Sequence, residues 1–417
     1  MPTALATPVL EPGSDRYATA VAGYNLAARH RSIVVVPDDE DGLGAAVRLA
    51  HRQSRTLAVQ ATGHGTLGSP ENGLLILTGR LTRIDIDMSG RTARVGAGVR
   101  WGDLVDRCAA VGLAPLGMAS ERSVGVVGYT LGGGTGPFAR SQGFAADHVV
   151  SLELVDSTGT RWTIDQDRDP DLFWALRGGR DGFGVVSALT LRLIPAPPVF
   201  AATASYRRGA IPAALAAYAG WQRAAPDVLS SDAQLLRAPG SPPSLQVDLV
   251  FAGPAAEGRR WLERLTEVAQ PDHQQTFVGS PAHLLHSRPA PRPLPLWSRS
   301  TVLDALPAEV VPALLDVVGP EREVPLLAVE VRPLGGVAAR PPVVPNAVGG
   351  RDAAALVNVI AAPNPALFES AVPEVAGRLF DRLAPWSRDR SLLNFDPLRS
   401  PSCWDGATYA RLEATRR

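Results

Sequence analysis

Apolar and polar positions in the first part of the chain switch repeatedly between the spacing of a strand and the spacing of a helix. The apolar run SIVVVP at 32–37 predicts a buried strand. Asp38 or Asp39, directly after it, can cap a helix. The apolar positions of that helix recur every three or four residues: Leu43, Ala46, Val47 and Ala50. This stretch therefore predicts a strand followed by a helix with one buried face.

The same two patterns continue to about residue 195. The alternation of Leu57, Val59 and Ala61 predicts a strand that leads directly into His64, so we expect this histidine on the loop where the strand ends. Further strands are expected at 74–77, 83–88, 92–98, 149–160 (with a turn) and 184–195, and helices from 101 to about 112 and at 169–178. These elements predict an α+β unit of about 195 residues.

The pattern changes after about residue 196. Alternating positions at 244–253 and 326–334 predict strands, and an alanine-rich stretch at roughly 210–225 predicts a helix. The proline-rich run 288–297 is typical of an extended loop, which we prefer to a partner-binding segment because such runs inside a domain are mostly connections. The length of 417 residues also favours two domains over one.

Charge and composition exclude several classes of function. The 41 basic and 41 acidic residues give a net charge of zero, so a nucleic-acid partner is not expected. The chain contains no lysine, which excludes a Schiff base and a P-loop. Cys108 and Cys403 form no C-x-x-C pair, so we expect no metal site. Since no apolar run is long enough to span a membrane and the N-terminus lacks the pattern of a signal peptide, we expect a cytoplasmic protein without a membrane partner.

Glycines gather in three clusters: ATGHG at 61–65, SERSVGVVGYTLGGGTG at 120–136 and LRGGRDGFGVV at 176–186. Backbone N–H groups exposed in such loops bind anions, above all phosphate, so three clusters in one unit predict a large phosphorylated ligand. Gly63, Gly65 and Gly68 spell G-x-G-x-x-G. A proline-containing segment and a strand follow in place of a helix, however, so the fingerprint of a nicotinamide dinucleotide site is not met.

Six motifs of this unit stand in an order and spacing seen in one family: VQATGHG, GAGVRWGDL, GLAPLGMASERSVGVVGYTLGGG, GFAADHV, DLFWALRGG and GFGVV. On these motifs the chain resembles the FAD-linked oxidases of the vanillyl-alcohol oxidase type, most closely their berberine-bridge-enzyme-like branch. The resemblance covers nearly all of the first 195 residues and returns in SLLNFDP near the C-terminus. It implies an α+β fold with a two-part, PCMH-type FAD-binding domain at 1–195 and 386–417. A substrate-binding domain built on an antiparallel sheet would be inserted at 196–385.

The resemblance also implies where FAD binds. In the family, the histidine of GHG is bonded covalently to the C8 methyl group of the flavin, and His64 occupies that place. The other expected FAD contacts are Gln60, Ala61, Thr62, Gly63, Gly65, Ser120, Arg122, Ser123, Val124, Gly125, Gly128, Tyr129, Gly132, Gly182, Val185, Val186, Asn394 and Phe395. Glu121 stands where many relatives carry a second, cysteinyl link, so a double link is not expected. Gln60 stands where arginine is common, which leaves the charge of the pyrophosphate to the backbone of the loops.

By the same resemblance, the protein is expected to be an oxidase of secondary metabolism that removes a hydride from a C–H next to oxygen or nitrogen of a small-molecule substrate. Dioxygen (O2) would take up the electrons. Tyr129 would donate a hydrogen bond to the pyrimidine end of the flavin. Phe395 has no proton to exchange, so the base is expected from the second domain. The candidates there are Tyr206, His283, His286 and Glu330, the last with Arg332 as its partner on one strand face.

Three alternatives remain at this point. The chain could be an FAD-dependent dehydrogenase or an oxidative cyclase that does not use O2, or a non-catalytic binding protein with a flavin fold. The departures at Gln60, Glu121 and Phe395 are what give the last alternative its weight. The sequence leaves the identity of the substrate and the oligomeric state open.

Overall fold

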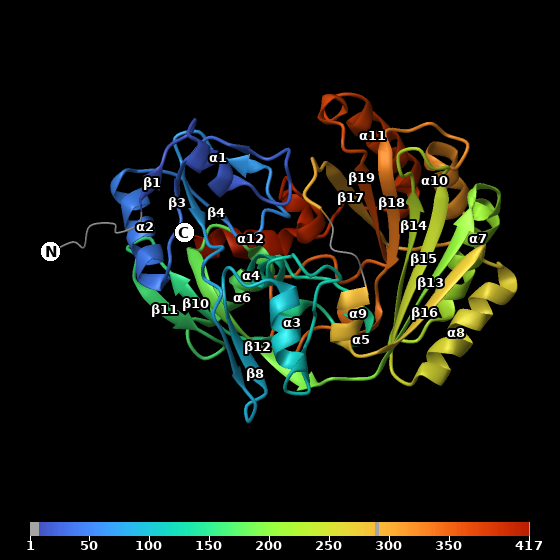
Figure 1. Ribbon diagram of the computed structural model, residues 1–417, viewed down its shortest axis with the longest axis horizontal. Coiled ribbons are helices and arrows are strands. Elements are labelled where there is room, and N and C mark those ends of the chain that lie inside the picture. Colours follow the sequence, from blue (N-terminus) through green and yellow to red (C-terminus); the bar gives the residue numbers. More distant parts are fainter. Residues whose placement is uncertain (1–7, 288–291, 417) are drawn as a thin grey trace.

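The computed structural model describes residues 8–287 and 292–416, which form two halves lying side by side (Figure 1). The start of the proline-rich run, 288–291, and the first seven residues lie outside the described residues. Within the described part, no helix is long and apolar enough to cross a membrane. The first half contains β1 (Val9–Leu10), α1 (Asp15–Val21), β2 (Arg29–His30), β3 (Ile33–Val35), α2 (Glu40–Arg52), β4 (Leu57–Gln60), β5 (Gly68–Ser69), β6 (Leu74–Leu77), β7 (Ile84–Asp87), β8 (Thr92–Gly96), α3 (Trp101–Ala109), β9 (Leu113–Pro115), α4 (Val126–Leu131), α5 (Ala139–Gln142), β10 (Val149–Val155), β11 (Arg161–Ile164), α6 (Pro170–Gly179) and β12 (Val185–Pro195).

Two larger sheets carry the first half, and β2 and β5 form a third, of two parallel strands. The strands β3, β6 and β4 pair in parallel, and β1 is added antiparallel at the edge. The second sheet is antiparallel, in the order β11-β10-β12-β8-β7, and β9 pairs with the end of β12. Helix α2 begins where the sequence predicts it, because the side chain of Asp39 accepts a hydrogen bond from the backbone N–H of Gly42 at 2.7 Å. The apolar residues expected on one helix face are all buried: Leu43, Ala46, Val47 and Ala50.

The second half is built on one seven-stranded sheet. Its elements are β13 (Val199–Arg207), α7 (Ile211–Trp221), β14 (Leu229–Leu236), β15 (Ser244–Ala252), α8 (Ala255–Val268), β16 (His273–Gly279), α9 (Pro281–Ser287), β17 (Ser298–Leu303), α10 (Val310–Val318), β18 (Leu326–Pro333), β19 (Ala355–Ala361) and α11 (Ala371–Leu383). Helix α12 (Gly406–Arg416) follows near the C-terminus. The sheet is antiparallel throughout, in the order β16-β13-β15-β14-β18-β19-β17. Short 3-10 turns connect the elements of both halves: η1 (Ala145–His148), η2 (Arg208–Ala210), η3 (Gln222–Ala224), η4 (Gly336–Ala339), η5 (Pro365–Leu367), η6 (Ala384–Trp386), η7 (Leu393–Phe395) and η8 (Pro401–Cys403).

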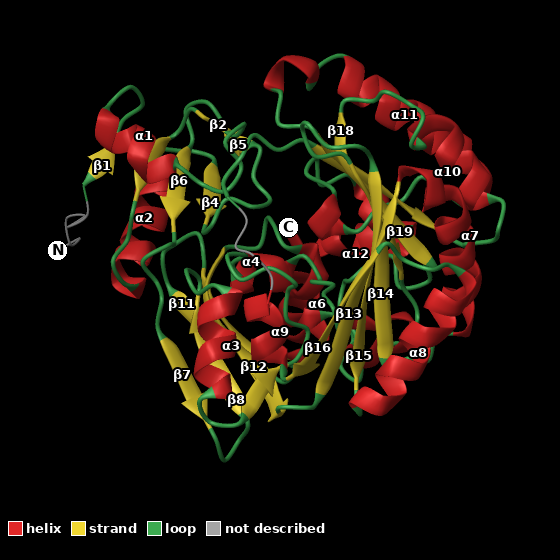
Figure 2. Cartoon of the chain, turned by 45° about the vertical axis from the view of Figure 1, so that its right-hand side comes forward, coloured by secondary structure: helices red, strands yellow, loops and turns green. Residues whose placement is uncertain are grey.

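The two faces of the seven-stranded sheet have different neighbours. Helices α7, α8, α10 and α11 cover its outer face, and the other face looks toward the first half (Figure 2). Side chains alternate along a strand, so Val329 and Val331 of β18 belong to the apolar core under the helices. Glu330 and Arg332 therefore point to the opposite face, toward the first half. This alternation places polar side chains over the loops of the first half.

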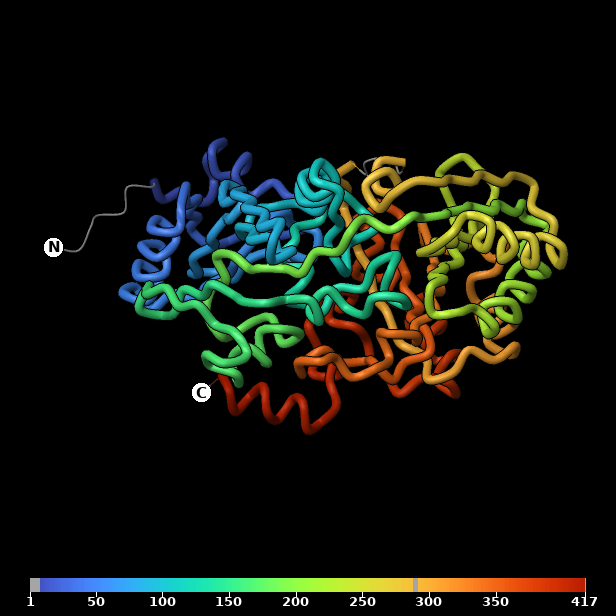
Figure 3. Tube along the Cα trace, turned by 90° about the horizontal axis from the view of Figure 1, so that it is seen from below, coloured from blue at the N-terminus to red at the C-terminus, as the bar shows by residue number. Residues whose placement is uncertain are grey.

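The C-terminal segment returns to the first half. Helix α12 lies against the segment that contains α6 (Figure 3), and Leu412 of α12 packs with Trp174 of α6 in a small buried cluster. The side chain of Asn394 in η7 accepts a hydrogen bond from Gly134 N at 2.8 Å and donates one to Tyr129 O at 3.1 Å. The α+β fold with an inserted antiparallel sheet, which the sequence predicts, is confirmed. The exact domain boundaries at 195 and 385 stay predictions.

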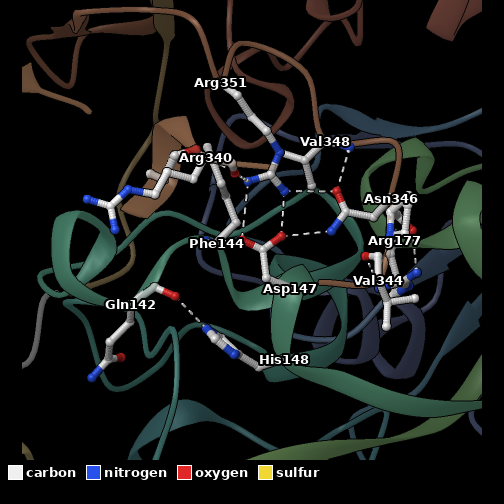
Figure 4. A network of polar contacts seen from close by, with 12 residues as sticks. Gln142, Phe144, Asp147, His148, Arg177, Arg340, Val344, Asn346, Val348 and Arg351 are labelled. Carbon is white, nitrogen blue, oxygen red and sulfur yellow. Dashed lines mark hydrogen bonds and ion pairs between the residues drawn. The ribbon is translucent and has the colours of Figure 1, made fainter. Parts of the chain in front are cut away.

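A second connection between the halves is a partly buried polar network around Asp147 of η1 (Figure 4). The carboxylate of Asp147 accepts a hydrogen bond from Asn346 Nδ2 at 2.7 Å and forms an ion pair with Arg351. Nearby, Arg177 of α6 donates to the carbonyl oxygen of Pro345 at 2.6 Å. Residues 344–351 belong to the loop between β18 and β19, so this network ties that loop to the first half.

Candidate active site

A cavity of about 380 Å³ lies between the loops of the first half and the inner face of the seven-stranded sheet. Its volume falls in the range of about 300–1,000 Å³ that is usual for small-molecule sites. Most of the FAD contacts expected from the sequence line it: Gln60, Ala61, Thr62, Gly63, His64, Gly65, Ser120, Val124, Gly125, Gly128, Tyr129, Val185, Val186, Asn394 and Phe395. The sheet adds the side chains of Ser298, Arg332, Asn358 and Ile360.

Four expected FAD contacts do not line this cavity. Arg122 pairs with Asp106 at 3.3 Å on the side of α3. Gly132 lies so close to the amide of Asn394 that a Cβ atom there would come within 2.7 Å of it, and Gly182 lies against Arg416. Ser123 stands behind His64 and contacts its ring. The glycines at 132 and 182 therefore serve the packing of the chain.

Tyr206 is wrong as a catalytic candidate. Its ring is buried in the core between the sheet and the outer helices, and its hydroxyl donates to the carbonyl oxygen of Ala269 at 3.1 Å. Alternation along β13 gives the inner face to Thr203 and Ser205 and sends Tyr206 to the helix side. The two histidines of α9 also lie outside the cavity, since His286 pairs with Asp106 at 2.6 Å and His283 contacts Ser280 at 3.1 Å.

Glu330 and Arg332 form a pair at the sheet side of the cavity, and the sequence places them on one face correctly. Arg332 Nε donates to Glu330 Oε1 at 2.9 Å, and Arg332 Nη1 donates to the carbonyl oxygen of Thr135 at 3.2 Å. Only Arg332 reaches the cavity wall. Burial raises the pKa of Glu330, an effect that the charge of Arg332 opposes. The guanidinium thus stands between the carboxylate and the cavity.

His64 is held on three sides. The ring of Tyr24 stacks on its imidazole, with ring centres 3.8 Å apart and planes 13° from parallel. Its Nε2 atom lies 2.8 Å from Ser123 Oγ and 3.3 Å from Glu121 Oε2. Burial lowers the pKa of His64 to about 4, although the charge of Glu121 acts in the opposite sense. The imidazole is therefore neutral at pH 7, as a nitrogen that forms a bond to carbon must be.

Two glycines of the cavity wall, Gly63 and Gly128, are needed for different reasons. Gly63 adopts a φ of +78°, and a Cβ atom there would lie 2.8 Å from Gly23 Cα. The close approach at Gly63 is thus to the chain at 23–24, where Tyr24 N donates to Thr62 O at 2.9 Å. At Gly128, by contrast, a Cβ atom would meet nothing within 4 Å. That glycine leaves open space at the cavity wall.

Four buried polar atoms on the cavity wall have no hydrogen-bond partner among the described residues: Gln60 Oε1, Tyr129 Oη, Thr135 Oγ1 and Asn358 Oδ1. A buried polar atom without a partner costs about 1–3 kcal/mol, so four on one wall indicate a polar ligand that satisfies them. Burial raises the pKa of Tyr129, which keeps its hydroxyl protonated and able to donate.

Arg180 is a charged residue of the cavity wall that the sequence analysis did not predict. It adopts a left-handed backbone conformation with a φ of +59°, which is strained for a side chain other than glycine. Its guanidinium lies about 3.6 Å from the position of a Cβ atom on Gly65, and it makes no hydrogen bond or ion pair with the rest of the described chain. Burial lowers its pKa to about 10, so it still carries its charge at pH 7. An unpaired cation at this place fits an anionic group such as a diphosphate.

Comparison with known proteins agrees with this geometry. Residues 32–165 match the FAD binding domain family. The FAD-linked oxidoreductase pgmH of Aspergillus terreus is 33% identical over 196 residues, which are 46% of this chain and 39% of that protein. The chain thus spans well under half the length of this relative. Among the described residues, no group of three or more His, Cys, Asp or Glu side chains could hold a metal ion.

Two solved structures match nearly the whole chain. The 6-hydroxy-D-nicotine oxidase of Arthrobacter nicotinovorans superposes with a TM-score of 0.86 at 20% identity and covers 100% of this chain and 96% of its own. The glucooligosaccharide oxidase of Acremonium strictum, described as carrying a 6-S-cysteinyl, 8α-N1-histidyl FAD, gives 0.84 at 18%, covering 98% and 94%. Residues 32–165 therefore match an FAD binding domain, and the chain as a whole has the fold of these two oxidases.

Proposed function

We propose that the protein is an FAD-dependent oxidase that removes a hydride from a C–H next to oxygen or nitrogen of a small molecule and passes the electrons to O2. One observation carries the proposal. On the FAD-domain side of the cavity lie the unpaired cation Arg180 and the neutral imidazole of His64, which is stacked on Tyr24. On the opposite side lie polar side chains of the seven-stranded sheet. FAD, when bound, supplies the hydride acceptor, and the protein supplies position and electrostatics.

The residues present fit FAD. Arg180 would bind the diphosphate, a role that the neutral side chain of Gln60 cannot fill. The unpaired Oε1 of Gln60 and hydroxyl of Tyr129 would form hydrogen bonds to the cofactor. We propose that His64 forms the covalent link, since its imidazole is neutral and lies on the cavity wall. Because Glu121 stands where relatives carry the cysteine of a second link, the link through His64 would be the single one to the flavin.

The sheet side of the cavity would bind the substrate. Arginine cannot act as a base, so Arg332 would donate a hydrogen bond to the oxygen or nitrogen of the substrate. Glu330 fixes the guanidinium from behind and is therefore a positioning residue. The free Oδ1 of Asn358, directly opposite Glu330 on the neighbouring strand, can accept the O–H or N–H proton of the substrate in a hydrogen bond. Such contacts suit small alcohols, amines and sugar-like compounds.

Acid precipitation of the purified protein tests the covalent link. We expect a yellow pellet from the wild type and a colourless pellet with yellow supernatant from His64→Ala, because only the imidazole link survives denaturation. His51→Ala, on the exposed end of α2, is the matched control and should give a yellow pellet. Colour that stays in the His64→Ala pellet would show that another residue carries the flavin.

A peroxide-coupled screen over alcohols, amines and glycosides tests the reaction. We expect at least one class to bleach the bound flavin anaerobically and to release hydrogen peroxide in air. Bleaching without peroxide, with electrons accepted by an artificial dye instead, would identify a dehydrogenase. A flavin that no compound of the panel reduces would count against an oxidase of this substrate class.

A further inference from the structure

Three side chains at the cavity wall form a chain of hydrogen bonds that ends on His64. Ser123 Oγ donates to Glu121 Oε2 at 2.6 Å, and Ser123 N donates to Glu121 Oε1 at 2.8 Å. His64 Nε2 lies 2.8 Å from the same Ser123 Oγ. These three residues, Glu121, Ser123 and His64, are called the His64 relay below.

The His64 relay fixes which imidazole nitrogen carries the proton. A serine hydroxyl has one hydrogen, and Ser123 gives it to the carboxylate of Glu121. Ser123 Oγ can therefore only accept from His64, so the proton of the neutral imidazole must be on Nε2. The second nitrogen, Nδ1, is left with a free lone pair, and it makes no hydrogen bond to any residue within 8–287 or 292–416.

The surroundings of the ring support this arrangement. Tyr24 stacks on the imidazole and restricts its rotation, and the nearby charge of Arg100 disfavours a second proton on it. The side chains of His64 and Glu121 are 20% and 23% exposed, so the relay is largely shielded and yet open to water at Glu121. Tyr24, Arg100 and Glu121 are the titratable groups whose charges reach this site.

We propose that Glu121, acting through Ser123, is a positioning residue and proton acceptor that directs His64 Nδ1 to bond the C8 methyl carbon of FAD. The inference rests on the covalent link of the proposed function and adds to it the residues that make the link form. No cysteine is needed at position 121, because its glutamate serves the histidyl link instead of adding a second one.

The lone pair of Nδ1 forms the C–N bond, one C–H bond of the methyl group breaks, and its electron pair passes to the flavin ring. The imidazole then bears a positive charge while Nε2 still holds its proton. Ser123 Oγ accepts that proton and gives its own to Glu121, which releases it to water. Dioxygen takes up the two electrons and two protons, one from the methyl group and one from Nε2, as hydrogen peroxide.

The first test follows the formation of acid-stable flavin when purified full-length protein is incubated with FAD in air. We expect Glu121→Gln and Ser123→Ala to bind FAD but to attach it about 10²-fold more slowly, the size of effect expected for a lost proton acceptor. Ser123→Thr keeps the hydroxyl and should restore the rate. In Glu121→Gln the rate should rise with pH, because solvent base replaces the carboxylate.

Two control variants separate the relay from general damage to the loop. Ser141→Ala removes a hydroxyl that bonds only within its own turn, and Glu71→Gln removes an exposed carboxylate that pairs with Arg31 at 3.5 Å. Both should attach FAD at the wild-type rate. Equal rates in Glu121→Gln, Ser123→Ala and the wild type would overturn the proposal.

The second test measures the tautomer without any attachment. With 8-demethyl-FAD, which lacks the carbon to be bonded, nitrogen-15 NMR of histidine-labelled protein should show the proton of His64 on Nε2, with the signal assigned from His64→Ala. Ser123→Ala should give a mixture of both tautomers. A wild type that loses all FAD on acid treatment but shows this tautomer would contradict only the covalent link. A wild type with the proton on Nδ1 would contradict the His64 relay.

Discussion

Replacement of Arg180 by alanine is expected to weaken FAD binding by about 10²-fold and to leave the flavin-free chain at least as stable as before. Charge-assisted hydrogen bonds are each worth about 1.5–3 kcal/mol, and about 1.4 kcal/mol corresponds to a factor of ten in affinity. The guanidinium makes no hydrogen bond or ion pair in the described chain, and the charge of Asp181 opposes the effect of its burial only in part, so the free protein gains little from it. If Arg180 served only the structure, its replacement by alanine would destabilise the flavin-free chain and leave the affinity for FAD unchanged.

The affinity is best measured in the His64→Ala background, where FAD stays non-covalent and titration reports a dissociation constant. Arg180→Gly removes both the side chain and the strain of the left-handed φ, and should therefore melt at a higher temperature than Arg180→Ala while binding FAD equally weakly. Arg31→Ala, an exposed arginine, serves as the control with unchanged affinity. A drop in the stability of the flavin-free chain with unchanged FAD affinity would assign Arg180 to structure.

The sequence predicted most of the residues that line the FAD-domain side of the cavity, because that side is made of short loops whose residues are neighbours in the chain. In the loop of His64 and in the loop that leads to Tyr129, the residues that line the cavity lie within a few positions of a glycine. A short sequence motif therefore includes both the glycine and the residues of the site. Asn394 is 260 positions away from Gly134. It could be assigned only because a family resemblance connected the two segments.

The sheet side could not be assigned in the same way. Whether a residue of β13 faces the cavity or the helices depends on the register of a strand, and a difference of one position moves the side chain to the opposite face. Tyr206 was misassigned for this reason, whereas Glu330 and Arg332 fall on the inner face. Asn358 belongs to no recognisable sequence motif. Its place opposite Glu330 follows only from the pairing of β18 with β19.

Arg180 was missed for a different reason. The cluster at 176–186 contains two arginines, and nothing in the sequence separates their roles. In the structure Arg177 donates to three backbone carbonyl groups, one of them Phe173 O at 3.0 Å, whereas Arg180 makes no such bond. Distinguishing a satisfied from an unsatisfied guanidinium requires the positions of residues more than 150 places further along the chain.

The network of Figure 4 leads to the second large effect, because one buried and one partly buried cation, Arg177 and Arg351, depend on one carboxylate. Asp147 and Arg351 have side chains that are 9% and 15% exposed, and the charge of Asp147 also acts on Arg177. Burial lowers the pKa of Arg177 to about 10, and Asp147 opposes that shift. Breaking a buried pair from one side costs about 3–5 kcal/mol, because the remaining charge is left without compensation.

Asp147→Asn should therefore lower the free energy of unfolding by about 3–5 kcal/mol, measured by urea denaturation followed by circular dichroism. Because the amide has nearly the same size as the carboxylate, the decrease in the free energy of unfolding measures the contribution of the negative charge. Asp38→Asn, whose exposed carboxylate pairs with exposed Arg80, should cost about 0–1 kcal/mol and serves as the control. Because the network connects the loop 344–351 to the first half, the FAD affinity of Asp147→Asn should fall together with its stability. A variant as stable as the Asp38→Asn control would show that the loop between β18 and β19 is held by its backbone contacts alone.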